Sequence, residues 1–358
     1  MLPAQPSGTA PFVLSVLDNA HTGVGQTARE SFTEIIALAQ LAERRGYHRF
    51  WMSEHHAMPA AAASSPQILL SRLTGETDHI RLGAGGVMLP NHVPLVIAEQ
   101  FGMLDTLAPG RIDLGLGRAP GTDSSTAAAL RRSDAANGEF PQQVMELLGF
   151  LNNDFPDKHP YRNVHAVPGP WQAEQNRVPL PTHGPEVWIL GSSPYSAQLA
   201  GLLGRPYAFA LQFGRADVVT AMRQYREHFR PSAVLDEPYS VVSVGVVAHD
   251  DAAEAGRQTA SAAMAMLRML QRKSYKLLPT DEVEAFRATV EEQRILDSYM
   301  RQFLHGTKAH VADGLERLHR QTEVNEVMLV VMGHSRQIQS RTVDLLADHY
   351  KLPNRSDF

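Results

Sequence analysis

The stretch Ile80–Gly117, IRLGAGGVMLPNHVPLVIAEQFGMLDTLAPGRIDLGLG, contains one complete strand–helix–strand unit. Its first part, Ile80–Leu89, is rich in aliphatic side chains and predicts a strand. In residues 94–107 apolar side chains recur at helical spacing, and Pro109-Gly110 ends that helix. Residues 111–117 then alternate Ile, Leu and Leu with Asp, Gly and Gly, which predicts a second strand.

The same unit repeats along the chain. Strands are predicted at 12–17, 48–53, 80–89, 111–117, 186–190, 207–213, 239–247 and 326–332, with helices at 31–46, 66–77, 94–107, 194–204, 215–229 and 336–350. Eight such units in 358 residues predict an α/β fold, a (β/α)8 TIM barrel that forms a single domain over 1–358. An open doubly wound sheet is the alternative.

Two stretches do not fit a minimal barrel. Residues 133–185 contain many prolines and turn residues, which predicts an irregular insertion after the fourth strand with room for a small hairpin. Residues 251–321 predict two or three helices with a break near 278–280. This second insertion either covers the barrel mouth or packs over the outer helices.

Composition excludes several classes of protein. The absence of cysteine excludes a disulfide scaffold, a thiolate nucleophile, a zinc finger and an iron–sulfur site. A net charge of −5 gives no reason to expect nucleic acid or an anionic membrane as a partner. No signal-peptide pattern opens the sequence, and no apolar run reaches about 18 residues. We therefore expect a cytoplasmic protein.

Chemistry-bearing residues follow the second strand, which runs into Glu54-His55-His56. In a TIM barrel the carboxyl ends of the strands form the active-site mouth. Histidine exchanges a proton near neutral pH, and only one of two adjacent residues on a strand faces inward. A metal pair is disfavoured because adjacent residues on a strand chelate poorly. A histidine hydrogen-bonded within a loop is the structural alternative.

The next three strand ends are rich in glycine and serine. Gly83–Gly86 lets a flat ligand approach the backbone closely, or marks a bulge. Arg118 is a candidate anion clamp. The segment Gly191–Ser196 runs into a helix and offers hydroxyl and N–H groups to a phosphate, or is an ordinary N-cap at Ser193. Gly333-His334-Ser335 is an alternative phosphate site.

Together these motifs resemble the luciferase-like flavin monooxygenase family, the group of the bacterial luciferase α subunit. The resemblance is strong over residues 12–121 and clear again at 191–196. It implies an enzyme, a homodimer, that receives reduced FMN from a separate NAD(P)H:flavin reductase. Through a C4a-peroxyflavin it transfers one oxygen atom from O2 to a small organic substrate, by hydroxylation, epoxidation or Baeyer–Villiger insertion. Secondary metabolism is the expected setting.

The resemblance also implies roles for individual residues. His55 is the catalytic residue, and Gly85-Gly86 matches a cis peptide that lies against the flavin ring. The resemblance places Glu99 near the flavin and Arg118 at its phosphate, with Arg131 as a second phosphate arginine. The remaining flavin-binding positions are Glu54, Gly191, Ser192, Ser193 and Ser196. At Ser192 the luciferase α subunit has a glutamate. Residues 272–300 match the mobile lid of the family.

Two other functions remain open at this point. F420-dependent oxidoreductases share the barrel and a similar third strand, but they transfer hydride. A non-catalytic flavin-binding or partner subunit is the second alternative, and the Glu54-His55-His56 motif argues against it.

Overall fold

The computed structural model describes residues 3–133, 135–180, 184–213, 217–271, 273 and 275–355. Its strands are β1 (Val13–Asp18), β2 (Arg49–Met52), β3 (Arg81–Met88), β4 (Ile112–Gly117), β5 (Glu186–Gly191), β6 (Tyr207–Ala210), β7 (Ser240–Ala248), β8 (Leu304–Gly306) and β9 (Glu326–Val331). Its helices are α1 (Ala28–Arg44), α2 (Pro66–Thr74), α3 (Pro94–Leu107), α4 (Ser124–Ala129), α5 (Ala136–Asn152), α6 (Pro170–Asn176), α7 (Pro194–Leu202), α8 (Val218–His228), α9 (Ala252–Leu270), α10 (Thr280–Ala285), α11 (Val290–Met300), α12 (Lys308–Thr322) and α13 (Arg336–His349). Two short 3-10 helices are η1 (Leu89–Asn91) and η2 (Leu211–Phe213).

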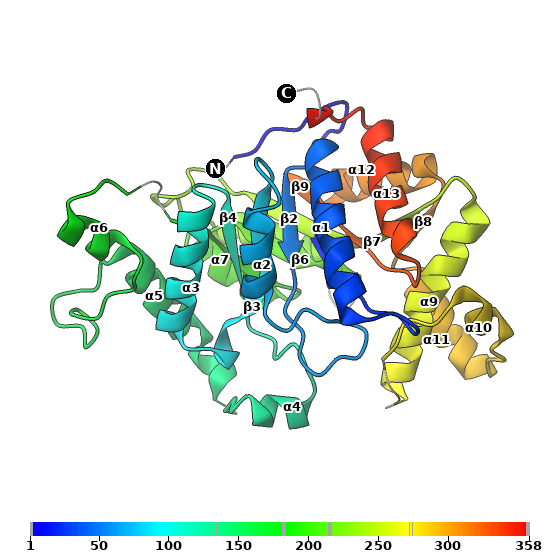
Figure 1. Ribbon diagram of the computed structural model, residues 1–358, viewed down its shortest axis with the longest axis horizontal. Helices are drawn as coiled ribbons and strands as arrows, with labels where there is room; N and C mark the ends of the chain where they lie inside the picture. The colour runs from blue at the N-terminus through cyan, green and yellow to red at the C-terminus, as the bar shows by residue number, and fades with distance from the viewer. Residues whose placement is uncertain are drawn as a thin grey trace.

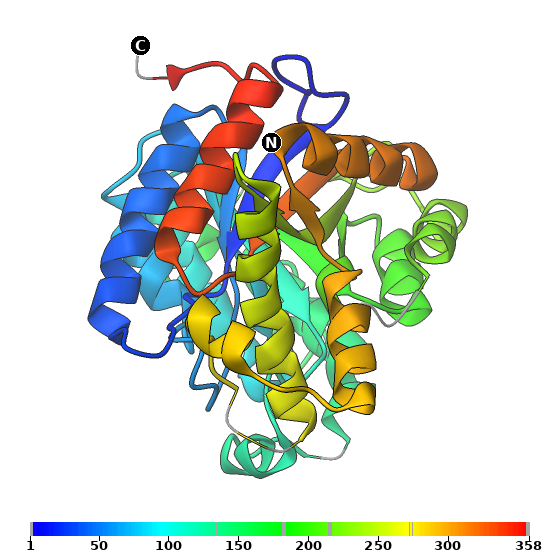
Figure 2. The ribbon, with the colours of Figure 1, turned by 90° about the vertical axis from the view of Figure 1, so that its right-hand side faces the viewer.

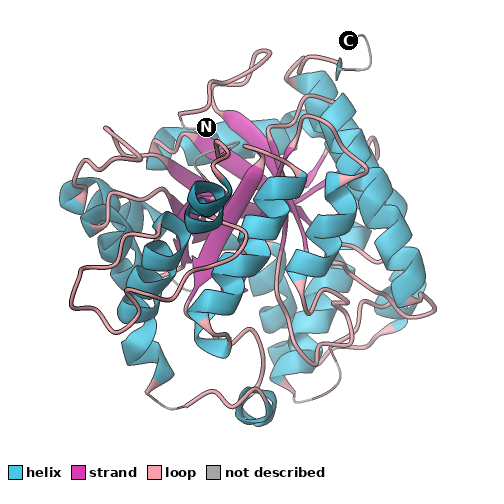
Figure 3. Cartoon of the chain, turned by 60° about the vertical axis from the view of Figure 1, so that its left-hand side comes forward, coloured by secondary structure: helices cyan, strands magenta, loops and turns pink. Residues whose placement is uncertain are grey.

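The sheet closes on itself. Strands β1 to β6 pair in chain order, β6 also pairs with β7, and β9 pairs with both β7 and β1. All these pairs are parallel, so eight strands form the predicted (β/α)8 barrel and the open sheet is excluded. Figures 1 and 3 show the helices enclosing these strands.

Alternation along the strands decides what fills the barrel. Ile112, Leu114 and Leu116 of β4 pack in the large apolar cluster between the strands and the outer helices. The alternate residues of β4 therefore point into the barrel. Among them, Asp113 is fully buried and binds Arg49 at 2.8 Å and Arg81 at 2.7 Å.

The lower half of the barrel therefore carries buried charges. Arg49 also binds Glu326 of β9 at 3.0 Å, and Trp51 Nε1 donates to Asp113 Oδ2 at 2.8 Å. The guanidinium of Arg49 lies 4.7 Å from the ring centroid of Trp188. Because these groups are paired with one another, the barrel interior can hold charges. Together with Trp51 they fill the barrel below the carboxyl ends of the strands.

The insertion between β7 and β9 spans the predicted residues but contains more elements than the two or three helices predicted. It contains α9, α10, α11, the additional short strand β8, which pairs with β7, and α12. Helix α12 packs on β7, β8 and α13 and takes the place of the outer helix, while α10 and α11 pack on α9, as Figure 2 shows. Residues 272 and 274 of the predicted lid lie outside the described residues.

Part of this insertion reaches the barrel mouth. Val24 N donates to Leu277 O at 2.9 Å, so the segment between α9 and α10 lies along the β1–α1 loop. Helix α11, by contrast, packs on α9 and has no buried residue. Within the described part of the chain, no helix is long and apolar enough to cross a bilayer.

The insertion after β4 is more regular than predicted. Helix α5 covers 17 residues of it and packs on α3 as the outer helix that follows β4. No strand is present among the described residues of 133–185, so the hairpin is not formed there. Aromatic contacts hold the irregular part: Phe150 packs edge to face on Phe155 at 4.8 Å and stacks on Tyr161 at 5.6 Å between ring centroids.

Candidate active site

A cavity of about 340 Å³ opens at the carboxyl ends of the barrel strands. Most of the predicted site residues line it: His55, Gly85, Gly86, Arg118, Gly191, Ser192, Ser193 and Ser196. They lie at or just after the carboxyl ends of β2, β3, β4 and β5, with Ser196 in α7, so barrel closure brings together motifs that are up to about 140 residues apart in sequence. Glu54, Glu99 and Arg131 are the predicted residues that do not line this cavity.

His55 lines the cavity just after the end of β2. Its Nδ1 lies 3.0 Å from Ser53 Oγ, and its backbone N–H donates to Ala63 O at 2.9 Å. Burial lowers the pKa of the His55 imidazole to about 4, with His56 lowering it further and Glu54 opposing the change. His55 is therefore neutral at pH 7, and because Nδ1 is engaged, Nε2 is the nitrogen available to a ligand.

Glu54 lies behind the cavity wall, where it is fully buried. Its Oε1 accepts from His56 Nε2 at 2.8 Å and His92 Nε2 at 2.9 Å, and its Oε2 accepts from Met88 N at 3.0 Å. Burial raises the pKa of this carboxyl, but these hydrogen bonds outweigh burial and hold the pKa at about 2. Glu54 therefore acts as an anionic anchor that joins the end of β2 to the end of β3.

Glu99 lies on α3, partly buried, and outside the cavity. Its neighbours Ile97 and Ala98 pack into the cluster between the strands and the helices. The structure therefore does not bring Glu99 together with the other predicted residues.

A glycine-lined wall forms one side of the cavity. The peptide bond between Gly85 and Gly86 is cis, as the resemblance implied. A Cβ atom at Gly85 would lie 2.7 Å from Trp51 Cε3, and one at Gly86 would lie 2.6 Å from Gly115 O. Side chains are thus excluded on this wall, which leaves a flat backbone surface for a ligand.

One end of the cavity contains the start of α7. Ser193 is the N-cap residue, yet its side chain makes no capping hydrogen bond, which argues against the ordinary N-cap. Ser193 Oγ lies 3.4 Å from Ser196 Oγ, and Ser196 Oγ donates to Ser193 O at 2.9 Å. The N–H groups of the first turn and the Ser193 hydroxyl thus remain available to an anion, which the helix dipole favours.

Arg118 supplies the positive charge at this end. Its guanidinium lies 4.4 Å from the ring centroid of Tyr195, the second residue of α7. Arg132 donates to Arg118 O at 2.5 Å and to Asn91 Oδ1 at 2.8 Å. Arg131 is exposed with a φ of 58°, so the arginine tied to this end is Arg132 and not the predicted Arg131.

The inner wall contains residues that the sequence did not single out. Ser243 Oγ donates to Gln212 Oε1 at 2.8 Å, and both line the cavity together with Asn19. The rest of this wall is apolar and comprises Leu17, Trp51, Leu190, Ala208, Val241 and Met328. Isolated polar residues such as Asn19 and Gln212 carry no motif, so only barrel closure identifies them.

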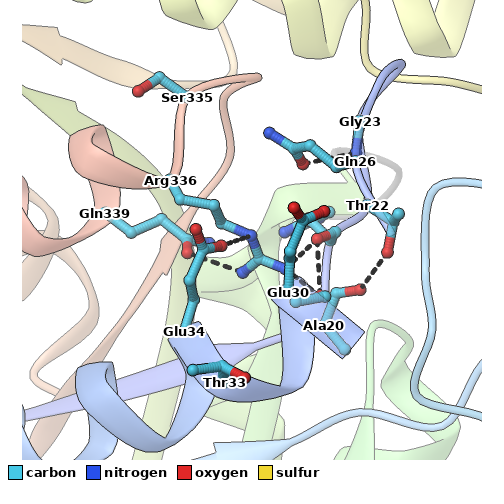
Figure 4. A network of polar contacts seen from close by, with 12 residues as sticks. Ala20, Thr22, Gly23, Gln26, Glu30, Thr33, Glu34, Ser335, Arg336 and Gln339 are labelled. Carbon is cyan, nitrogen blue, oxygen red and sulfur yellow. Dashed lines mark hydrogen bonds and ion pairs between the residues drawn. The ribbon is translucent and has the colours of Figure 1, made fainter. Parts of the chain in front are cut away.

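A buried arginine fixes the β1–α1 loop that carries Asn19. Figure 4 shows Arg336, the first residue of α13, bound to Glu34 at 3.0 Å and to Gln339 at 3.0 Å. It also donates to the His21 carbonyl and to the Ser31 hydroxyl. These bonds connect the loop to both α1 and α13 and so fix its position at this side of the barrel mouth.

At the alternative phosphate site after β9, polar groups of the motif already bind other residues of the chain. Ser335 N donates to Gln258 Oε1 at 3.1 Å, and His334 Nε2 lies 3.0 Å from Val24 O. None of Gly333, His334 and Ser335 lines the cavity. Over the described ranges, no cluster of three or more His, Asp or Glu side chains is arranged to hold a metal ion.

Comparison with known proteins agrees with this geometry. A profile of the luciferase-like monooxygenases matches residues 12–324. The chain belongs to the luciferase-like monooxygenase family. It is 40% identical over 336 residues to a luciferase-like monooxygenase of Escherichia coli (strain K12), covering 93% of this chain and 96% of that one. It is 32% identical to the N-acetyl-S-alkylcysteine monooxygenase of Bacillus subtilis (strain 168), covering 94% and 97%.

This luciferase-like monooxygenase is also similar to a solved structure. The crystal structure of apo-MsnO8 matches with a TM-score of 0.83 and 33% identity, covering 96% of this chain and 99% of that one.

Proposed function

We propose that this protein is the oxygenase component of a two-component flavin monooxygenase that uses reduced FMN and O2 to oxygenate a small organic substrate. One observation carries the proposal: a single cavity joins a neutral histidine, a backbone wall without side chains, and an arginine–serine anion site. A 28% identical relative over about half of this chain, from Acinetobacter baylyi, is named as the oxygenase component of a flavin-dependent trigonelline monooxygenase.

The residues present fit FMN. Arg118, Ser192 and Ser193 with the α7 N-terminus would hold the phosphate, and Gly85-Gly86 would lie against the flat ring. The Ser193 hydroxyl, which makes no capping hydrogen bond, and the Gly85-Gly86 wall, where a Cβ atom would clash, support this fit. When bound, reduced FMN supplies the electrons that activate O2 for transfer of one oxygen atom.

The chain's own residues then perform three tasks. His55 Nε2 holds or donates a proton beside the reacting atoms, because the ring is neutral and its other nitrogen is engaged by Ser53. Glu54 fixes the ends of β2 and β3, which carry His55 and the glycine wall. The apolar inner wall, with Trp51 as its floor, limits access of water from below.

Two substitutions test this function. We expect His55→Ala to leave FMN binding largely intact and to reduce product formation about 100-fold or more, in an assay supplied with reduced flavin by a reductase. We expect Arg118→Ala to weaken binding of FMN but to change riboflavin binding little, because riboflavin has no phosphate. Unchanged turnover in the first variant, or equal losses for both ligands in the second, would refute the assigned roles.

Cofactor preference distinguishes the F420-dependent alternative from the flavin-dependent function. A coenzyme F420-dependent tetrahydromethanopterin reductase from Methanopyrus kandleri shares the fold, with a TM-score of 0.64 at 15% identity. Titration of the protein with FMN and with F420, followed by fluorescence, distinguishes the two functions. Tight binding of F420 alone would favour hydride transfer. Failure to bind either cofactor productively would favour a non-catalytic subunit.

We also propose a homodimer, in the cytoplasm with its flavin reductase. Ile68 on α2 is 71% exposed, and Met103 and Leu107 on α3 are 56% and 57% exposed. Helices α2 and α3 are neighbours on one face of the barrel, and a second copy packed on this face would cover these exposed side chains. Sedimentation velocity measures the oligomeric state, and a monomer at micromolar concentration would contradict this proposal.

A further inference from the structure

Two thioethers lie in the wall of the candidate active site. Met88 at the end of β3 and Met328 in β9 both line the cavity. Met103 on α3 and Met145 on α5 are 56% and 54% exposed and do not line it. The methionines nearest the reacting atoms are therefore not the ones most open to solvent.

Met88 packs against the segment that carries Arg118. Its sulfur lies 3.0 Å from where a Cβ of Gly117 would be, and its Cγ lies 3.2 Å from the Cβ position at Gly121. Its backbone N–H donates to Glu54 at 3.0 Å, so the main chain cannot move away easily. We call residues 117–121 the phosphate strap. The strap lies close to Met88 because its two glycines have no side chains.

We propose that Met88 is a site of oxidation to methionine sulfoxide by hydrogen peroxide formed in the cavity, and that this modification weakens flavin binding. The inference rests on the proposed function, which supplies reduced FMN and O2. When no substrate accepts oxygen, O2 takes two electrons and two protons from reduced FMN and leaves as hydrogen peroxide. One peroxide oxygen then bonds to the Met88 sulfur, the O–O bond breaks, the sulfur loses two electrons, and water is released.

The consequence follows from the packing of the strap. A sulfoxide is larger and more polar than a thioether, and the sulfur lies 3.0 Å from the position that a Cβ of Gly117 would occupy, so little free space remains beside the strap. The added oxygen displaces the strap or enters the cavity, and either change moves Arg118 relative to the serines of α7. An enzyme that wastes reductant thus lowers its own affinity for flavin, and methionine sulfoxide reductases can restore it.

Peptide mapping by mass spectrometry tests the modification. The wild-type protein turns over with FMN, a flavin reductase and NADH, without substrate and with catalase in the solution. We expect oxidation at Met88 to exceed that at Met103 and Met145, because catalase removes only the peroxide that has left the cavity. In a parallel sample, added hydrogen peroxide without flavin oxidises Met103 and Met145 first.

Flavin affinity tests the consequence. We expect the Kd of oxidised FMN, followed by flavin fluorescence, to rise about tenfold after turnover, the loss of roughly one hydrogen bond's contribution. Treatment with methionine sulfoxide reductase should reverse this rise. Met88→Leu keeps the volume and cannot be oxidised, so its Kd should not change with turnover. Met328→Leu, the matched cavity variant, should still lose affinity.

The outcomes separate the two proposals. A protein that binds no FMN and reduces no O2 refutes the proposed function, and this inference with it. A protein that binds FMN and releases peroxide, but leaves Met88 no more oxidised than Met103, refutes the inference alone. Loss of affinity in Met88→Leu equal to that of the wild type also refutes it.

Discussion

Replacement of Glu54 by glutamine tests whether the buried carboxylate behind the cavity supports the site. Glu54 Oε1 accepts from two histidines and Oε2 accepts from the Met88 N–H. A glutamine of the same shape has one acceptor oxygen, so its NH2 group must face either the histidine pair or the Met88 N–H. If the NH2 group faces Met88, a buried donor meets a donor and that hydrogen bond is lost. If it faces the histidines, both imidazoles must move the proton from Nε2 to Nδ1 to keep their hydrogen bonds.

The magnitude follows from the pKa of this carboxyl. Its fall from 4.5 to about 2 corresponds to about 3 kcal/mol of favourable interaction with the ionised form. Because the folded pKa is the lower one, this stability is present above pH 4.5 and is lost as the pH falls through 2. We expect Glu54→Gln to lower the free energy of unfolding by about 2–3 kcal/mol at pH 7 and to weaken FMN binding.

Urea denaturation followed by circular dichroism measures the stability, and flavin fluorescence measures the FMN affinity. Glu99→Gln is the matched control, because Glu99 lies outside the cavity, and it should leave FMN affinity unchanged. A stability loss below about 0.5 kcal/mol in Glu54→Gln, within the range of ordinary surface changes, would refute the anchor role. Loss of FMN binding in Glu99→Gln would restore the role that the family resemblance gave to Glu99.

Two further predictions concern the glycine wall of the cavity and the buried histidine His21. Gly86→Ala should destabilise the protein by about 1–3 kcal/mol and reduce FMN binding, because its Cβ would lie 2.6 Å from Gly115 O. The control is Gly256→Ala on α9, where the added Cβ would have open space. This variant should be neutral or stabilising in the same urea assay. Burial, with the nearby charges of Arg336 and His55, lowers the pKa of His21 to about 3, so the folded state resists protonation and stability falls as the pH drops below 6.5. Between pH 7 and 5, His21→Gln should lose about 2 kcal/mol less stability than the wild type, and equal losses would contradict the burial of a neutral His21.

The fold could be predicted from the sequence because local periodicity reports which face of each element is buried. The alternation of β4 and the helical spacing of 94–107 reflect burial of one face, and eight such units leave closure as the favoured arrangement. The features that the sequence did not predict also have local explanations. Strand β8 has three residues, too few for a pattern, and the many turn residues after residue 153 obscured the regular helix α5 before it.

The motif residues His55, Gly85-Gly86, Arg118 and Gly191–Ser196 were identifiable because each ends a predicted strand, and the barrel brings strand ends to one mouth. The sequence alone did not determine which residues in their neighbourhood join them. Whether Arg131 or Arg132 reaches Arg118, and whether Glu99 faces the cavity or the outside, depends on backbone angles and helix rotation. Only the closed barrel brings Asn19, Gln212 and Met88 to one cavity, because their contacts span strands that are distant in the chain.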